Sequence, residues 1–353
     1  MIDKMDNELK LVEYNLHSIG GVPSKVSQWY RFLFKTLKKN FPIENEATQV
    51  EKFASFIGRA VDEYEKMYET TNTLVVIVSL NNDLNMVDKR YVEIALRQLG
   101  YQTKLIDMAD FCQKAKMDEN NRRLLIQEIE VSVVYYRICP DEDFFSSDIL
   151  FHSLIQPIEM SRSVKIPDIG QVLVNFKKVQ QFLSSRKCGY FLKTLVYDDQ
   201  KWQGIEKTFV ETYDLHDSSI AKMALNHIDN FVLKLAFHEG GGTCLFNEDA
   251  KVKIEKWLCD WEGSLEERRQ FVLMKKILPP SFENWEILPG YHYNKSKFTA
   301  EFGFFGGLLA VDGQIIANDN IGYNARCKDQ SANESGIRDG NGRTSYLVVK
   351  AID

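Results

Sequence analysis

The sequence has 353 residues, of which 44% are apolar, and a formal net charge of -6. A chain of this length can bury a large core over roughly two or three structural units, which excludes a small module stapled by disulfides. Its acidic and basic residues are mixed, without the basic stripe that binding to a phosphate backbone requires, so nucleic acid is not an expected partner.

The cysteines and the N-terminal residues indicate the cellular location to expect. Six cysteines are scattered without a C-x-x-C pair, and we expect reduced thiols, not zinc ligands. The first ten residues contain no apolar signal-peptide core, and no stretch approaches the roughly 20 apolar residues that span a bilayer. We therefore expect a cytoplasmic protein with no membrane partner.

The first half of the chain alternates helical and strand-like patterns. Apolar residues recur at helical spacing over 47–67, which predicts an amphipathic helix with a core-facing stripe. The run TLVVIV at 73–78 is continuously apolar, as expected of a strand covered on both faces. A βαβ unit and one more buried strand are predicted after it, from a helix at 88–98 and strands at 103–107 and 132–136. Residues 71 to about 160 should thus form a compact parallel-sheet subdomain.

The second half continues the mixture of strands and helices. Strands are predicted at 231–235 and 271–276, a helix at 249–259, and a hairpin over 298–318 that turns at Asp312-Gly313. This mixed order of elements predicts an α/β fold. The five tryptophans are interpreted as packing residues: Trp29, Trp202, Trp257, Trp261 and Trp285.

Three consecutive glycines are the first candidate site. Gly240, Gly241 and Gly242 would leave backbone amides free to approach a phosphate closely. They fit neither the P-loop pattern nor the dinucleotide-binding pattern, and a plain surface turn between a strand and a helix is the alternative. Lys234 and Glu239 beside them favour a phosphate site, because they add a cation for phosphate and a carboxylate for its metal.

Two short polar pairs are further candidates. Glu13 and Asn15 would present two oxygens on one face of a strand, as Mg2+ accepts together with phosphate oxygens. Arg326 and Lys328 have the same spacing and, if extended, offer a fork for a carboxylate and a point charge for a phosphate. The alternatives are the polar face of an edge strand and solvated loop residues. A hydrolase triad is not supported, because no G-x-S-x-G pattern is present.

Taken in order, these segments resemble one family, the eukaryotic glutathione synthetases, which are ATP-grasp ligases. The resemblance runs from about Leu9 to Lys350. It is carried by LKLVEYN with the following Gly-Gly, FKKVQQ, FVLK with EGGG, VLMKKI with FENW and LPG, AEFGFFG, and NARCK. The spacing among the last four blocks also resembles that of the family.

The resemblance implies an ATP-grasp fold with a parallel-sheet substrate-binding subdomain and a lid. The implied domains are 1–70, the N-terminal part of the main domain; 71–165, the substrate-binding subdomain; and 166–353, the ATP-grasp region with a lid at about 205–295. The family's N-terminal region, which includes part of the usual dimer surface, has no counterpart in this sequence, and we expect either a fragment of a longer chain or a changed architecture. A homodimer is what the family implies.

Carried over by position, the resemblance assigns roles to residues from several segments. The catalytic residues would be Arg326, Lys234 and Gly241, and the Mg2+ ligands would be Glu13, Asn15 and Glu239. The ATP contacts would be Glu13, Lys177, Lys234, Gly240, Gly241, Gly242, Met274, Ile277, Glu301 and Lys328. The peptide substrate would contact Ser18, Asp83, Asn85, Arg137, Arg326 and Ile337.

The reaction that the family implies joins γ-glutamylcysteine to glycine through an acyl phosphate formed from ATP. Lysines, Mg2+ and loop amides would position the phosphates and neutralise charge, and the glycine loop would close as a lid. Departures from the family gather in the peptide pocket: Lys89 replaces an expected glutamine, and GIRDG at 336–340 replaces a G-V-A-A-G loop. Such changes can redirect specificity. The alternatives are a catalytically impaired binding protein with another partner and an α/β protein whose similarity is only ancestral.

Overall fold

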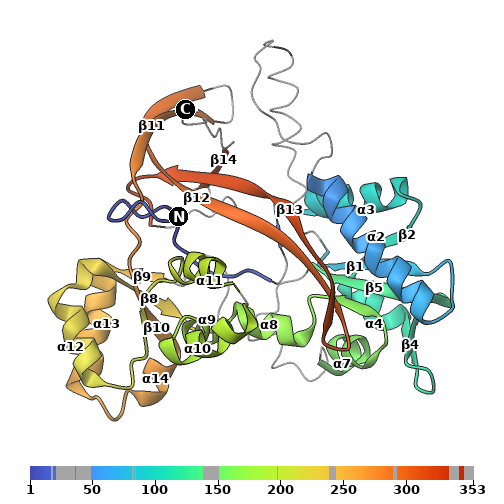
Figure 1. Ribbon diagram of the computed structural model, residues 1–353, viewed down its shortest axis with the longest axis horizontal. Helices are drawn as coiled ribbons and strands as arrows, with labels where there is room; N and C mark the ends of the chain where they lie inside the picture. Colours follow the sequence, from blue (N-terminus) through green and yellow to red (C-terminus); the bar gives the residue numbers. More distant parts are fainter. Residues whose placement is uncertain are drawn as a thin grey trace. The chain divides into compact units, whose positions relative to one another are not determined.

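The computed structural model (Figure 1) describes residues 1–16, 19–20, 36, 49–81, 83, 85–137, 151–196, 198–237, 244–288, 292–333 and 342–345. Contacts divide the chain into two compact units. Unit 1 contains Met1–Asn15, Leu173–Glu301 and Arg326–Thr344, and unit 2 contains Leu16–Val172, Phe302–Ala325 and Ser345–Asp353. Each unit therefore joins stretches that are distant in sequence. Within the described part of the chain, no helix combines the length and apolarity needed to cross a bilayer.

Unit 2 is built on a six-stranded sheet in the order β2-β1-β5-β4-β3, with β6 also paired to β5. The parallel neighbours are β1 (Leu74–Ser79), β2 (Gln102–Asp107), β5 (Ile129–Tyr136) and β6 (Val164–Ile166). The predicted βαβ unit is confirmed. The sheet also contains an antiparallel hairpin that the sequence pattern did not reveal, formed by β3 (Ala115–Asp118) and β4 (Arg123–Ile126).

Both faces of this sheet are covered, which explains the uninterrupted apolar sequence of β1. Val75 and Ile77 pack with α2 and α3 in one cluster, whereas Val76 and Val78 pack with α4 and α7 in another. Successive side chains of a strand point to opposite faces, so each face of the sheet has its own core. The covering elements are α2 (Gln49–Met67), α3 (Met86–Gln98), α4 (Met108–Lys114), a π-helical turn (Phe151–Ile155) and α7 (Gln156–Met160) (Figure 1).

Unit 1 contains a four-stranded sheet in the order β7-β10-β8-β9. One face packs against helices through Leu233, Leu273 and the fully buried Trp257. Alternation along β8 and β10 turns Lys234 and Met274 to the opposite face. The strands are β7 (Thr212–Tyr213), β8 (Phe231–Leu235), β9 (Cys244–Phe246) and β10 (Phe271–Lys275); the helices that follow them in this region are α12 (Ser218–Asn226), a 3-10 turn (Ile228–Asn230), α13 (Asn247–Cys259) and α14 (Leu265–Arg269).

Helix α9 is anchored to the end of β8. The N–H of Lys177, its first residue, donates to the carbonyl of Ala236 at 2.8 Å. The rings of Phe176 and Phe237 meet edge to face, with centroids 5.7 Å apart. These contacts bring Lys177 toward Lys234. The helices of this stretch are α8 (Ile169–Asn175), α9 (Lys177–Leu183), α10 (Arg186–Leu195) and α11 (Asp199–Glu206).

A third sheet contains the predicted hairpin and follows the order β11-β12-β13-β14. Asp312 and Gly313 have φ angles of 49° and 78°, as a two-residue Asp-Gly turn with positive φ at both positions requires. The hairpin strands are longer than predicted, and their residues are divided between the two units. The strands are β11 (Ser281–Leu288), β12 (His292–Val311), β13 (Gln314–Asp329) and β14 (Gly342–Ser345).

The interpretation of every tryptophan as a packing residue is wrong for Trp285. Trp202 and Trp257 are 5% and 0% exposed, but Trp285 on β11 is 59% exposed. Its ring contacts Tyr293 edge to face, with centroids 5.7 Å apart. Residue type alone could not decide this, since the tertiary structure determines which face of a strand is covered. Trp29 lies outside the described residues.

Candidate functional site

A narrow pocket in unit 1 gathers four of the residues predicted to contact nucleotide. Glu13 comes from the N-terminal segment, Lys177 from α9, Lys234 from β8 and Met274 from β10. The two strands are neighbours in the sheet, and alternation points both of their side chains to this face. The pocket encloses about 40 Å³, and within it Glu13 contacts Lys177.

Two buried lysines oppose one carboxylate in this pocket. The Lys177 Nζ lies 3.2 Å from the Glu13 Oε2, and Lys177 and Lys234 are each 6% exposed. The Asn15 Nδ2 donates to the Glu13 Oε1 at 3.1 Å, and the Lys234 Nζ donates to the Val12 carbonyl at 3.4 Å. Desolvation by burial would raise the pKa of Glu13, but the attraction of Lys177 and Lys234 outweighs it and lowers this pKa below its usual value. The structure therefore places two buried lysines close to the ionised carboxylate of Glu13.

The prediction of a strand through Glu13 and Asn15 is wrong, because residues 10–16 do not form a strand. The side chain of Gln180 forms the hydrogen bonds to this backbone that a neighbouring strand would form. The Tyr14 N–H donates to the Gln180 Oε1 at 3.3 Å, and the Gln180 Nε2 donates to the Tyr14 carbonyl at 3.0 Å. Glu13 and Asn15 contact each other through the Asn15 amide nitrogen, and Gln180 holds the backbone between them. Gln180 was not predicted as a site residue, although its position three residues after Lys177 places the two side chains on one face of α9.

Replacing Gln180 by alanine is expected to lower the stability of unit 1 by about 1 to 3 kcal/mol, since the backbone groups of Tyr14 lose their partners. Gln180→Glu should cost a similar amount, because a carboxylate cannot donate to the carbonyls of Tyr14 and Asn175. The measurement is the urea midpoint of the full chain. Gln203→Ala, at an exposed position on α11, is the control. An equal shift of the midpoint in Gln180→Ala and Gln203→Ala would contradict the role of Gln180 in holding the backbone of Tyr14.

The predicted pair near the end of the chain lies on β13. Arg326 and Lys328 point to one face, while Cys327 between them is buried, so the extended arrangement is confirmed. Arg326 forms an ion pair with Glu301 on β12, and the Lys328 Nζ donates to the Asn333 carbonyl at 2.6 Å. Desolvation by burial lowers the pKa of Arg326, opposed by attraction to Glu13. Arg326 thus adds a third cation near the pocket.

The strand expected to border the adenine is shorter than predicted. Strand β10 ends at Lys275, and the N–H of Lys276 donates to the Asn230 carbonyl at 2.7 Å. Met274 is inside the strand and 6% exposed, whereas Ile277 follows the strand and is half-buried. Only Met274 of this pair lines the pocket.

Three residues predicted to contact a peptide belong to unit 2. Arg137 directly follows β5 and pairs with Asp88, with 3.0 Å between Nη2 and Oδ2. Asp83 forms an ion pair with Lys89. Asn85 precedes α3, and its N–H donates to the Asp83 Oδ1 at 2.7 Å. All three therefore lie near the start of α3 or the end of β5.

The glycine loop and three other predicted site residues lie outside the described part of the chain: Ser18, Glu239, Gly240, Gly241, Gly242 and Ile337. Among the described residues, no group of three or more His, Cys, Asp or Glu side chains could hold a metal. The carboxylate of Glu13 and the amide oxygen of Asn15 fit Mg2+ in donor type, since this ion takes a few protein oxygens along with phosphate oxygens.

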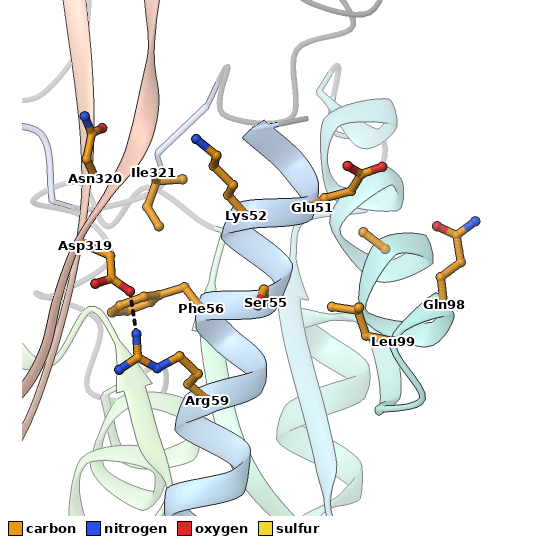
Figure 2. Close-up of a pocket in the computed structure, with 11 residues that line it drawn as sticks. Glu51, Lys52, Ser55, Phe56, Arg59, Gln98, Leu99, Asp319, Asn320 and Ile321 are labelled. Carbon is orange, nitrogen blue, oxygen red and sulfur yellow. Dashed lines mark hydrogen bonds and ion pairs between the residues drawn. The ribbon is translucent and has the colours of Figure 1, made fainter. Parts of the chain in front are cut away.

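A second and wider pocket lies wholly in unit 2 (Figure 2). It encloses about 830 Å³ between α2, the end of α3 and β13. Phe56 and Leu99 form part of its apolar lining, and the Arg59 Nη1 pairs with the Asp319 Oδ2 across it. None of the predicted site residues lines this pocket, so it does not contribute to the candidate site.

Comparison with known proteins places these features in a family. Residues 1–348 match the family described as eukaryotic glutathione synthase, ATP binding domain. The glutathione synthetase of Xenopus laevis is 29% identical over 94% of this chain and 69% of its own length. The glutathione synthetase of Homo sapiens is also 29% identical, with the same coverage.

A solved structure supports the fold. A glutathione synthetase like-effector from Globodera pallida, in its apo form, superposes with a TM-score of 0.71 over 91% of this chain and 68% of that chain. The sequence identity is 20%, so this likeness concerns the fold alone. Together with the family match, it confirms the predicted α/β, ATP-grasp fold.

Proposed function

Because the chain belongs to the family of eukaryotic glutathione synthases, whose ATP-binding domain it matches over residues 1–348, we propose that it is an ATP-dependent ligase that forms a carbon-nitrogen bond. The observation that carries the proposal is the ion pair of Glu13 with the buried Lys177, in a pocket that the buried Lys234 also lines. Buried cations are costly unless they are paired, and a triphosphate is a partner that matches them.

Lys177 and Lys234 would bind the phosphates of ATP, and Met274 would contact the adenine. Glu13 and Asn15 would hold Mg2+, which neutralises charge on the phosphate oxygens when bound. Since Glu13 pairs with Lys177 at 3.2 Å, nucleotide binding would replace that pair: phosphate takes the lysine and the metal takes the carboxylate. The glycines 240–242 would supply backbone amides to the phosphates.

The reaction proceeds in two displacements. The carboxylate of the acyl donor attacks the γ-phosphorus of ATP, and ADP leaves. The amine of the acceptor then attacks the activated carbonyl, phosphate leaves, and the amine loses a proton to solvent or phosphate. In the family these substrates are γ-glutamylcysteine and glycine, which we propose as the reference pair, with Arg326 binding a carboxylate of the donor. A Mg2+ requirement, a homodimer, a cytoplasmic location, the domain limits and the lid remain predictions.

The proposal predicts phosphate release that depends on ATP, Mg2+, an acyl donor and an amine together. γ-Glutamylcysteine and related dipeptides should be tested with glycine, and phosphate measured by a coupled assay. Arg326→Met is expected to keep MgATP binding but to lose donor-dependent release by about tenfold or more, since it removes a charged contact of about 1.5 to 3 kcal/mol. Arg269→Met, at an exposed position, is the control. Unchanged release by Arg326→Met, or MgATP binding without any donor-dependent release, would contradict the proposal.

A further inference from the structure

The sheet of unit 2 has a point where the chain reverses its winding. From β1 the chain passes through α3 to β2 on one side, whereas β5 lies on the other side of β1. Helix α3 packs on one face of the sheet, and α7, which lies between β5 and β6 in the chain, packs on the other. In open parallel sheets, ligands bind outside the carboxyl ends of the two strands at such a point. Here these ends are Ser79 of β1 and Tyr136 of β5.

Among the residues that the structure describes, four charged side chains lie at these two strand ends. Lys89 and Arg137 are only 1% and 3% exposed, and Asp83 and Asp88 are partly exposed. The Lys89 Nζ donates to the Ser79 Oγ at 2.6 Å and pairs with Asp83. Arg137 donates to the Asp88 carboxylate and to the Ile19 carbonyl. Two cations and two carboxylates therefore balance each other at the place where the topology favours a ligand.

Lys89 is the unusual member of this group. It lies at the end of the first turn of α3, at a position whose side chain is turned into the protein. A buried ammonium costs free energy unless it is paired and hydrogen-bonded, and Asp83 and Ser79 provide both. Asp83 is consequently occupied by a group of the protein itself. With a neutral side chain at position 89, the same carboxylate would be available to an ammonium of a ligand.

We propose that Lys89 determines which ligand this crevice accepts. Its ammonium occupies the place opposite Asp83 that the ammonium of an amino-acid ligand would take. The accepted ligand carries a carboxylate, which would replace the partly exposed Asp88 as the partner of the fork-shaped Arg137, and it lacks an adjacent ammonium. A ligand with an ammonium has to break the Lys89–Asp83 pair or leave its own charge unpaired. Within the proposed ligase function, on which this step rests, the acyl donor is a des-amino carboxylic acid.

The test compares two probes that differ by one amino group, γ-glutamylcysteine and glutarylcysteine. In calorimetry on the full chain without nucleotide, the wild type is expected to bind glutarylcysteine at least about tenfold more tightly than γ-glutamylcysteine. This ratio is equivalent to about 1.4 kcal/mol. Lys89→Gln is expected to reverse the preference toward γ-glutamylcysteine by a similar factor. Lys104→Gln, on β2 of the same sheet, is the matched control and should leave the ratio unchanged.

Each outcome decides the proposal. A wild-type preference for γ-glutamylcysteine, binding of neither probe by wild type, or an unchanged ratio in Lys89→Gln would overturn it. If Lys89→Gln lowers the melting temperature of the protein, Lys89→Met can replace it, because it removes the same charge. The ratio of the two affinities in the wild type needs no variant. Titration with MgATP is run separately. Its failure would count against the nucleotide site alone, because the probe comparison uses no ATP.

Discussion

Replacing Lys234 by methionine is expected to weaken MgATP binding by at least about thirtyfold, from the 2 to 5 kcal/mol that loss of one partner of a buried charged contact costs. Lys234 lies inside β8, is 6% exposed, and points into the pocket that holds Glu13. Methionine keeps the length of the side chain, so the strand and its neighbours should remain packed. The measurement is isothermal titration of the full chain with ATP in the presence of Mg2+.

The control for this variant is Lys222→Met, which removes the same charge from an exposed position on α12 of the same unit. It should bind MgATP like wild type. Equal affinities in Lys234→Met and wild type would refute the role of the pocket. An equal loss in both variants would show that net charge, and not the buried contact, controls binding.

Replacing Trp257 by alanine is expected to destabilise the protein by about 3 to 5 kcal/mol, the usual cost of truncating a large buried aromatic residue. Trp257 is fully buried on α13, its ring centroid lies 5.3 Å from that of Phe271, and its Nε1 donates to Glu267 at 2.7 Å. The variant loses packing on the face of the sheet opposite Lys234. The measurement is the guanidinium midpoint followed by far-UV circular dichroism.

Trp285→Ala is the matched control, because it removes the same side chain from a position that is 59% exposed. Its expected effect is within about 0.5 kcal/mol, typical of surface substitutions. Similar midpoints for the two variants would mean that Trp257 does not support the core of unit 1. Such a result would also remove the proposed support for Lys234 and Met274 on the far face of that sheet.

Part of the candidate site could be read from sequence, and part could not. The residue types and spacing of Glu13, Asn15, Arg326 and Lys328 were visible as short patterns, and their resemblance to a family gave them roles. The two hydrogen bonds between Gln180 and the backbone of Tyr14 were not visible, because they join α9 to a segment that is distant in sequence. The pairing of Arg326 with Glu301 was not visible for the same reason. The resemblance assigns Arg326 to the peptide and Glu301 to ATP, and only the β12–β13 hairpin brings the two side chains together.

The sequence by itself determined the local elements whose signals lie within a few neighbouring residues. The apolar run of β1, the periodicity of α2 and the Asp-Gly turn each follow from backbone geometry and side-chain alternation. Only the tertiary structure decided which faces are covered, as the contrast between Trp257 and Trp285 demonstrates. It also decided which charges meet, including Lys89 with Asp83. Burial and ion pairing depend on segments distant in sequence, so no local pattern contains them.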